Sequence, residues 1–292
     1  MYLNQFSNSV AALDMTVLEE FTSLKQSATE LGIGYGDNSR YVSRNLVFRH
    51  QRFHFLEWGE PGNPVVVLLH GTNQSAHSWD LVSLNLSRHY HVFALDQRGH
   101  GDSEWNRGAH YTVADMAEDA SAFLKILGIE RPIVIGHSMG GMVTLTLAHR
   151  EPDLMRAMVV VDIGPEVNER GSKMISEFVG RNIEFDDLEE FLDRVEEYDP
   201  YRSREHIERT IKYNLLRRAD GRYVTKHDRR RFHISNDIEK GRVSGAPTLV
   251  ELTSLDIPLL ILRGGDSNVL TAESAQRFSD EVPTARLITV PD

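Results

Sequence analysis

A serine able to act as a nucleophile follows a short apolar run in this sequence. Residues 132–135 are apolar and 133–135 are β-branched, the motif G-x-S-x-G occupies residues 136–140, and an apolar helix-forming run covers 142–148. A serine on a sharp strand-to-helix turn adopts a strained backbone, and glycines two positions away on either side leave room for the chain to pass. The N-terminus of the next helix favours developing negative charge. This spacing predicts a nucleophile elbow with Ser138 as the nucleophile.

Other polar residues that could support this serine also follow apolar runs. They are His70-Gly71-Thr72-Asn73 after residues 65–69, the loop from Asp96 to Ser103 after 91–95, Asp162 after 157–161, and Asp266 after 258–262. The carboxyl ends of parallel strands meet at one edge of a sheet, where ligands of open α/β folds bind. The sequence therefore predicts a site at that edge, built from these loops around Ser138.

The order of apolar segments predicts the fold class. Strands are expected at 46–48, 53–56, 65–69, 91–95, 132–136, 157–161, 258–262 and 285–290, and helices near 79–88, 113–127, 142–148, 248–254 and 273–280. Strands that alternate with helices imply right-handed crossovers. We therefore expect an α/β protein with a mostly parallel central sheet flanked by helices.

Two segments lie outside this alternation. Residues 1–43 are expected to form a helical extension and linker, with an amphipathic helix at 10–31. Residues 166–245 interrupt the core, which comprises 44–165 and 246–292, and are expected to form a helical cap. Nine acidic residues in 184–199 and seven Lys or Arg in 217–231 are expected to be solvated faces that pair within the cap, rather than a charged ligand site.

The composition of the chain limits the classes of function that it can have. The formal net charge of −11 argues against nucleic acid or an anionic membrane as the main partner, because either requires a basic face. The chain has no cysteine and no stretch as long as a membrane span, and its first residues do not resemble a signal peptide. We expect a cytoplasmic protein that binds a small molecule. The sequence is compatible with either a monomer or a homo-oligomer.

The motifs together resemble the α/β-hydrolase fold superfamily over residues 44–292. The resemblance is carried by His70-Gly71, by the Arg98-Gly99-His100-Gly101-Asp102-Ser103 loop, by Gly136-His137-Ser138-Met139-Gly140-Gly141 and by Arg263-Gly264-Gly265-Asp266. It is closest to the capped branch of esterases, carbon–carbon bond hydrolases and cofactor-free haloperoxidases. It implies that Ser138 is the nucleophile, that the Thr72 and Met139 N–H groups form the oxyanion hole, and that Asp266 is the triad acid. Asp162 is the competing acid.

The histidine of the triad is not identified within the chain. The resemblance places this histidine after the last strand, so we expect it just after Asp292. We also expect that the sequence is cut short before this histidine and before the last helix of the fold. His137 is expected to face away from Ser138, because neighbours in a strand point to opposite faces. His70 and His100 are expected to organise loops. None of the 13 histidines has metal-ligand spacing, so neither a metal nor another cofactor is expected.

The expected function is that of a serine hydrolase. Ser138 would attack a carboxylic ester or related acyl compound with an apolar part, and an acyl-enzyme would form. The alternatives are carbon–carbon bond hydrolysis or perhydrolysis with haloperoxidase activity, which share the triad, and a non-catalytic ligand-binding protein without the base. Aromatic residues of the cap suggest an apolar pocket; they are Phe178, Phe185, Phe191, Tyr198, Tyr201 and Tyr213.

Overall fold

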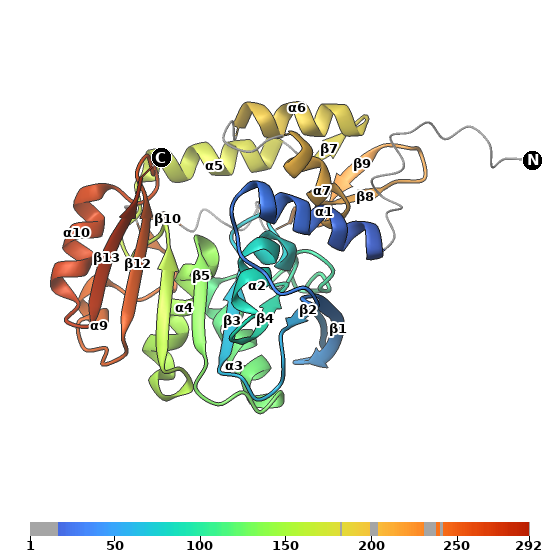
Figure 1. Ribbon diagram of the computed structural model, residues 1–292. Helices are drawn as coiled ribbons and strands as arrows, with labels where there is room; N and C mark the ends of the chain where they lie inside the picture. The colour runs from blue at the N-terminus through green and yellow to red at the C-terminus, as the bar shows by residue number, and fades with distance from the viewer. Residues whose placement is uncertain (1–16, 182, 199–203, 231–237, 240–241, 292) are drawn as a thin grey trace, which may run out of the picture.

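A twisted sheet of eight strands is the centre of the described chain (Figure 1). The computed structural model describes residues 17–181, 183–198, 204–230, 238–239 and 242–291. The strand order is β1-β2-β4-β3-β5-β6-β12-β13, and the six strands from β4 to β13 are parallel. The strands are β1 (Tyr41–Phe48), β2 (Gln51–Trp58), β3 (Val65–Leu69), β4 (His91–Leu95), β5 (Ile133–His137), β6 (Ala157–Val161), β12 (Leu259–Gly264) and β13 (Ala285–Val290). The predicted mostly parallel sheet is confirmed.

Two hydrophobic clusters, one on each face, hold helices against this sheet. The larger one joins β-strand side chains to those of α3, α4, α9 and α10, and the smaller one joins them to α1, α2 and a 3₁₀ helix, η2. Strand β4 is buried along its whole length, as expected between two covered faces. The bounds are α1 (Val17–Glu30), η2 (Ala76–Trp79), α2 (Asp80–Leu86), α3 (Val113–Ile126), α4 (Met139–Arg150), η3 (Pro152–Leu154), α9 (Leu249–Leu252) and α10 (Ala272–Glu281).

The segment between β6 and α9 lies over the carboxyl ends of the parallel strands (Figure 1). It contains α5 (Glu169–Arg181), β7 (Glu184–Phe185), α6 (Leu188–Tyr198), α7 (Arg204–Asn214), β8 (Leu215–Arg217), β9 (Tyr223–Thr225), β10 (Ile238–Glu239) and β11 (Arg242–Val243). Three of these strands form a small sheet in the order β7-β9-β8, which the expectation of a purely helical cap missed. Strands of two or three residues carry too little periodicity to be recognised in a sequence.

The charged runs of the cap pair with each other. The carboxylate of Glu184 contacts the guanidinium of Arg229 at 3.1 Å, and Asp186 contacts Arg222 at 2.8 Å. Both pairs join the acidic run to the basic run and remain partly exposed to solvent. This is the arrangement expected of solvated faces that pair within the cap.

Helix α1 connects the N-terminal extension to the cap. The Glu20 carboxylate is buried, and it accepts hydrogen bonds from Lys212 Nζ of α7 at 2.5 Å and from the hydroxyl of Tyr41 at the start of β1. Burial raises the pKa of Glu20, but these hydrogen bonds outweigh burial and hold the pKa below its usual value. The carboxylate therefore joins three elements that are far apart in the sequence.

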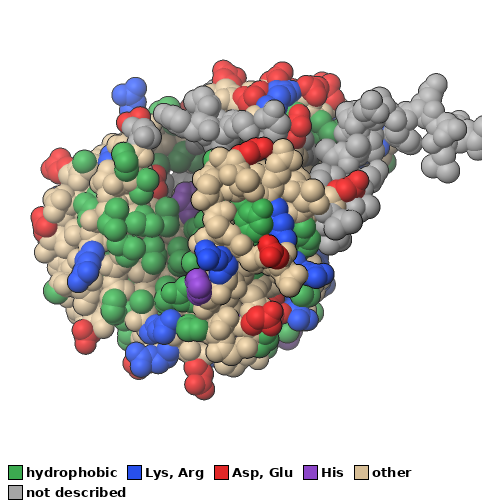
Figure 2. Space-filling view, viewed as in Figure 1, with side chains coloured by type: hydrophobic (Ala, Val, Ile, Leu, Met, Phe, Trp, Pro, Cys, Tyr) green, Lys and Arg blue, Asp and Glu red, His purple; other side chains and the backbone are tan. Residues whose placement is uncertain are grey.

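The outermost strand, β13, leaves apolar side chains on the surface. Ile288 and Val290 are both about half exposed. The space-filling view shows hydrophobic side chains gathered over β12 and β13 (Figure 2).

In the described residues, no helix is long and apolar enough to cross a membrane.

Candidate active site

Ser138 lies in a strained turn between β5 and α4. Its backbone angles are φ 49° and ψ −116°, a conformation that is costly for a residue with a side chain. The flanking glycines are required by the close approach of backbone atoms. A Cβ on Gly136 would lie 2.2 Å from the Gly140 carbonyl oxygen, and a Cβ on Gly140 would lie 2.1 Å from the carbonyl oxygen of Leu69. The motif thus forms a turn that presents Ser138 at the carboxyl end of β5.

Replacing Gly140 by alanine is expected to destabilise the protein by at least about 3 kcal/mol, because its Cβ would collide with backbone that cannot move aside. Urea unfolding measures this change. Gly180 on α5 is the matched control, since no atom lies within 4 Å of the position of its Cβ. There, alanine is expected to be neutral or to stabilise by up to about 1 kcal/mol. Equal effects of the two substitutions would contradict the steric explanation of the elbow.

The loop that follows β3 is held against the elbow by one side chain. Gln74 Oε1 accepts a hydrogen bond from the Gly71 N–H at 2.8 Å and lies 3.1 Å from His137 Nδ1. Asn73 has a left-handed backbone with φ 61°, and Thr72 lines the same cavity as Ser138. Met139 begins α4, and N–H groups in the first turn of a helix have no acceptor within that helix. Both predicted oxyanion donors therefore belong to elements that meet at Ser138.

The prediction that His137 faces away from the nucleophile is wrong. His137 lines the cavity beside Ser138. The rule of alternating faces applies within a strand, and the turn at Ser138 leaves the strand conformation. Burial lowers the pKa of His137, and the negative charge of Asp162 partly offsets that effect.

The two candidate acids lie in different environments. Asp162 lines the cavity with Ser138, has a left-handed backbone with φ 58°, and directly follows β6. Its carboxylate accepts hydrogen bonds from the Gly264 N–H at 3.1 Å and the Ser267 hydroxyl at 2.9 Å. Asp266 is exposed, does not line the cavity, and has no hydrogen bond or ion pair with any residue that the structure describes.

His70 and His100 are engaged in loop contacts. His70 is fully buried; its Nδ1 lies 2.8 Å from the Gly71 carbonyl oxygen, and its Nε2 accepts a hydrogen bond from the Gln97 N–H at 3.0 Å. The Nδ1 atom of buried His100 lies 3.0 Å from the Arg98 carbonyl oxygen. With both nitrogens engaged, His70 has no lone pair available to accept a proton from Ser138.

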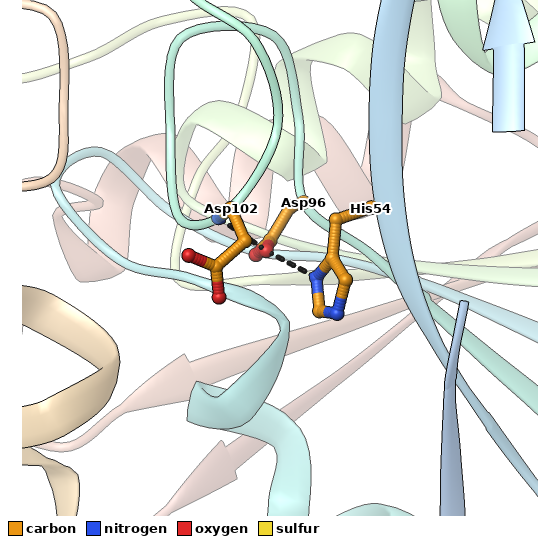
Figure 3. A group of neighbouring side chains, drawn as sticks. All are labelled: His54, Asp96 and Asp102. Carbon is orange, nitrogen blue, oxygen red and sulfur yellow. Dashed lines mark hydrogen bonds and ion pairs between the residues drawn. The ribbon is translucent and has the colours of Figure 1, made fainter. Parts of the chain in front are cut away.

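A buried carboxylate anchors the loops around the site (Figure 3). Asp96 accepts hydrogen bonds from the N–H groups of Ala76 at 2.6 Å and Asp102 at 2.9 Å, and from His54 Nδ1 at 2.7 Å. Burial raises the pKa of Asp96, but the hydrogen bond from His54 and the other contacts outweigh it, and the pKa lies below its usual value. Asp102 in turn contacts Lys226 Nζ at 2.7 Å. Asp96 and Asp102 thus already have protein partners, which fits an anchor for the loops better than a metal site.

The cavity at Ser138 has a volume of about 550 Å³ and lies between the sheet edge and the cap. This volume is in the range of small-molecule sites. Its apolar wall comes from α5, α6 and the loop after β12: Ile175, Phe178, Val179, Phe191, Val195 and Val269. Of the aromatic residues expected around the pocket, Phe178, Phe191 and Tyr213 line it, and Phe185 is buried in a cluster within the cap. The side chains of Tyr198 and Tyr201 lie outside the described part.

The lining of the cavity also contains polar residues that the sequence analysis did not identify as site residues. Arg209 of α7 and His77 of η2 are both buried and both line the cavity. Arg209 and Tyr213 are four residues apart and therefore share one face of α7. The spacing of these two residues is the signal that the sequence offers for this part of the site. It does not show whether that face of α7 points toward the cavity.

Known proteins resemble this chain in sequence and in structure. A family model of the α/β hydrolase fold matches residues 64–292. The esterase Rv0045c of Mycobacterium tuberculosis is 28% identical over 265 residues, which cover 88% of this chain and 83% of the esterase. A solved structure of that esterase has a TM-score of 0.75 at 26% identity and covers 95% of this chain and 92% of its own.

A second solved structure that is similar to this chain belongs to the same family. The crystal structure of an α/β hydrolase from Novosphingobium aromaticivorans has a TM-score of 0.72 at 27% identity, and the match covers 86% of this chain and 90% of that one. The family model, the similar structures and the relatives named as esterases agree with the geometry described above. The chain therefore belongs to the α/β-hydrolase fold family and is a hydrolase.

Proposed function

We propose that this protein is a serine hydrolase that cleaves a carboxylic ester through an acyl-enzyme on Ser138. The observation that carries the proposal is the strained serine, which lines a cavity shared with Thr72 and Asp162. Strain at a single residue persists where the surrounding structure enforces it, and such residues cluster at active sites. Esterases among the relatives support acyl transfer as the chemistry.

In the proposed reaction, Ser138 Oγ attacks the ester carbonyl while a general base takes the hydroxyl proton. The N–H groups of Thr72 and Met139 stabilise the oxyanion, and each such donor contributes about 10²–10³ in rate. Collapse of the tetrahedral intermediate breaks the bond to the alcohol, which leaves with the proton from the base. Water then attacks the acyl-enzyme with the same base, and the acid and free Ser138 are released.

We further propose that Asp162, rather than Asp266, is the acid of this triad. Asp162 lies in the cavity with Ser138, and two hydrogen bonds fix its carboxylate. A triad acid must hold an imidazole in one tautomer, which requires a fixed position near the nucleophile. The exposed Asp266 lacks this support.

The proposed base is a histidine carried by residues that follow Asp292. The last residue of β13, Val290, pairs with Gly264, and its carbonyl oxygen accepts a hydrogen bond from the Gly265 N–H at 2.8 Å. Gly264 is itself the donor to Asp162. A residue a few positions beyond Val290 would therefore emerge at the sheet edge beside Asp162, where an imidazole could contact both Asp162 and Ser138.

Trapping the acyl-enzyme tests this function. The full-length protein is mixed with p-nitrophenyl butyrate, quenched in acid and digested. We expect a burst of p-nitrophenol and a butyryl group on the peptide that contains Ser138. Turnover with the acyl group elsewhere, or without an acyl-enzyme, would contradict the mechanism. Saturable binding of the ester without any turnover would instead favour a non-catalytic ligand-binding protein.

A substrate panel separates the reactions that share this machinery. Carbon–carbon bond hydrolysis and perhydrolysis with haloperoxidase activity would use the same Ser138 and oxyanion donors. We expect ester cleavage to have the highest kcat/KM. A higher value for a carbon–carbon or peroxide substrate would reassign the function within the family.

A further inference from the structure

One oxygen atom joins the loop after β3 to the nucleophile elbow. Gln74 Oε1 accepts a hydrogen bond from the Gly71 N–H at 2.8 Å and lies 3.1 Å from His137 Nδ1. Gly71 follows β3, and His137 is the last residue of β5, directly before Ser138. The two segments approach closely, because a Cβ on Gly71 would lie only 2.7 Å from His137 Nδ1. Gln74 is therefore a bridge between the loop and the elbow.

The hydrogen-bonding groups of this bridge fix the state of both side chains. A backbone N–H can only donate, so the Gln74 atom that faces Gly71 is the amide oxygen and not the amide nitrogen. An amide oxygen can only accept, so the proton of the contact with His137 lies on Nδ1. Burial lowers the pKa of His137, and the Asp162 carboxylate partly offsets this effect. His137 is therefore a neutral imidazole with its proton on Nδ1 near neutral pH.

The same glutamine closes the turn that contains a proposed oxyanion donor. The Gln74 N–H donates to the Gly71 carbonyl oxygen at 3.3 Å, so residues 71–74 form a β-turn with Thr72 and Asn73 at its centre. Asn73 has φ 61°, a left-handed conformation as in type II turns, which asparagine adopts more readily than most residues with a side chain. Gln74 thus closes the turn twice, with its backbone N–H and with its side-chain oxygen.

We propose that Gln74 is a positioning residue for the oxyanion hole, because its amide oxygen holds the turn with the Thr72 N–H against the nucleophile elbow. It acts through Gly71 and His137 rather than on the reacting atoms. Oxyanion donors stabilise the transition state only when they are aimed at the oxygen that becomes charged, so a displaced turn loses part of this effect. The inference rests on the proposed serine hydrolase function, since the oxyanion forms in that reaction.

Gln74→Met tests the effect on catalysis, since methionine has a similar length and its sulfur is a weak acceptor. In the full-length protein, kcat for p-nitrophenyl butyrate is expected to fall by about 10–100-fold, less than the loss of a whole oxyanion donor, while KM stays within about threefold. An unchanged kcat, with or without a rise in KM, would refute the proposal.

Gln276 on α10 provides the matched control. It is exposed, and its Nε2 donates a hydrogen bond to Asp280 of the same helix at 2.8 Å. Gln276→Met removes a glutamine hydrogen bond far from Ser138 in the sequence and is expected to leave kcat and KM unchanged. An equal loss of kcat in both variants would show that the loss does not come from the bridge, and it would overturn the proposal.

The tautomer of His137 provides a readout that does not depend on turnover. In protein with isotopically labelled histidine, nuclear magnetic resonance distinguishes the two neutral tautomers by the chemical shifts of the ring nitrogens. We expect the neutral form protonated on Nδ1, assigned by the loss of its signals in His137→Asn. Gln74→Met is expected to abolish this preference, because it removes the acceptor. A His137 protonated on Nε2 in the unsubstituted protein would overturn the inference.

Gln74→Glu keeps an acceptor oxygen for both donors and adds a negative charge beside His137. This charge should raise the pKa of His137, and titration of the labelled imidazole measures the change. Asp162, whose charge also acts on His137, is the same in both proteins. An unchanged titration would show that the two side chains are not in contact and would refute the bridge. This variant decides the question if a thermal unfolding scan shows that Gln74→Met does not fold.

The trapping experiment separates this inference from the proposed function. If the unsubstituted protein forms no acyl-enzyme on Ser138, the serine mechanism fails and the role of Gln74 fails with it. If it forms the acyl-enzyme and Gln74→Met keeps the full kcat, only the role of Gln74 fails. We expect the acyl-enzyme in both proteins, formed more slowly in Gln74→Met.

Discussion

Ser138→Ala is expected to lower kcat/KM for ester hydrolysis by about 10⁴–10⁶-fold, because no other group can form the acyl-enzyme. The oxyanion donors and the cavity remain, so a small residual rate above that in water is expected. The measurement is hydrolysis of p-nitrophenyl butyrate by the full-length protein. Substrate affinity should change little, since the hydroxyl contributes mainly to the transition state.

Ser78 provides the matched control for this substitution. It also lines the cavity, but it lies in η2 and its hydroxyl is 3.4 Å from the Ser75 N–H. Ser78→Ala is expected to change kcat/KM by no more than about threefold. If both alanine variants lost activity equally, the loss would reflect damage to the cavity, and the assignment of Ser138 as the nucleophile would lose its support.

Asp162→Asn is expected to lower kcat by about 10³–10⁴-fold, the size of effect seen when a triad acid is replaced by its amide. Asn keeps the shape of Asp, and its amide oxygen can still accept a hydrogen bond from Gly264 or Ser267. The loss would arise because an amide does not stabilise a charged imidazole. Steady-state kinetics with p-nitrophenyl butyrate, together with an unfolding curve, separates this effect from instability.

Asp266→Asn is the comparison that decides between the two acids. Its side chain is exposed and makes no polar contact in the described residues, so a change of no more than about threefold is expected. The reverse pattern, with a large loss for Asp266→Asn and a small one for Asp162→Asn, would restore Asp266 as the acid and refute our choice.

The parts of the site that the sequence predicts well are local ones. The glycines around Ser138 are needed because backbone atoms approach each other four residues apart in the chain or across one neighbouring strand, and this requirement appears directly as a spacing. The strands were also predictable, because β4 and its neighbours are buried on both faces and read as continuous apolar runs. Such features require no knowledge of distant segments.

The choice of acid depends on a contact between distant segments. Asp162 and Asp266 both follow parallel strands, so the sequence places both at the same edge. What distinguishes them is that Gly264, at the end of β12, and Ser267, in the loop after it, donate hydrogen bonds to Asp162. That contact joins residues more than 100 positions apart, and no spacing rule predicts it.

The same limit explains why His137 was placed incorrectly and why Arg209 was missed. The orientation of His137 follows from the turn at Ser138, which ends the alternation of the strand. Arg209 lies in a charged cap whose basic residues pair mostly with acidic neighbours at the surface. This arginine is buried on a helix, α7, that packs against α1, α6 and η2. A buried arginine and a solvated one look alike in a sequence.

The contact of α1 with α7 has a consequence for exchanging caps between relatives. Glu20 of α1 binds Lys212, which lies three residues from Arg209 on the same helix. A chimaera that transplants residues 166–245 alone would separate a buried acid from its basic partner. The transferable module therefore includes α1 and the start of β1 together with the cap, although α1 lies outside the matched family region, residues 64–292.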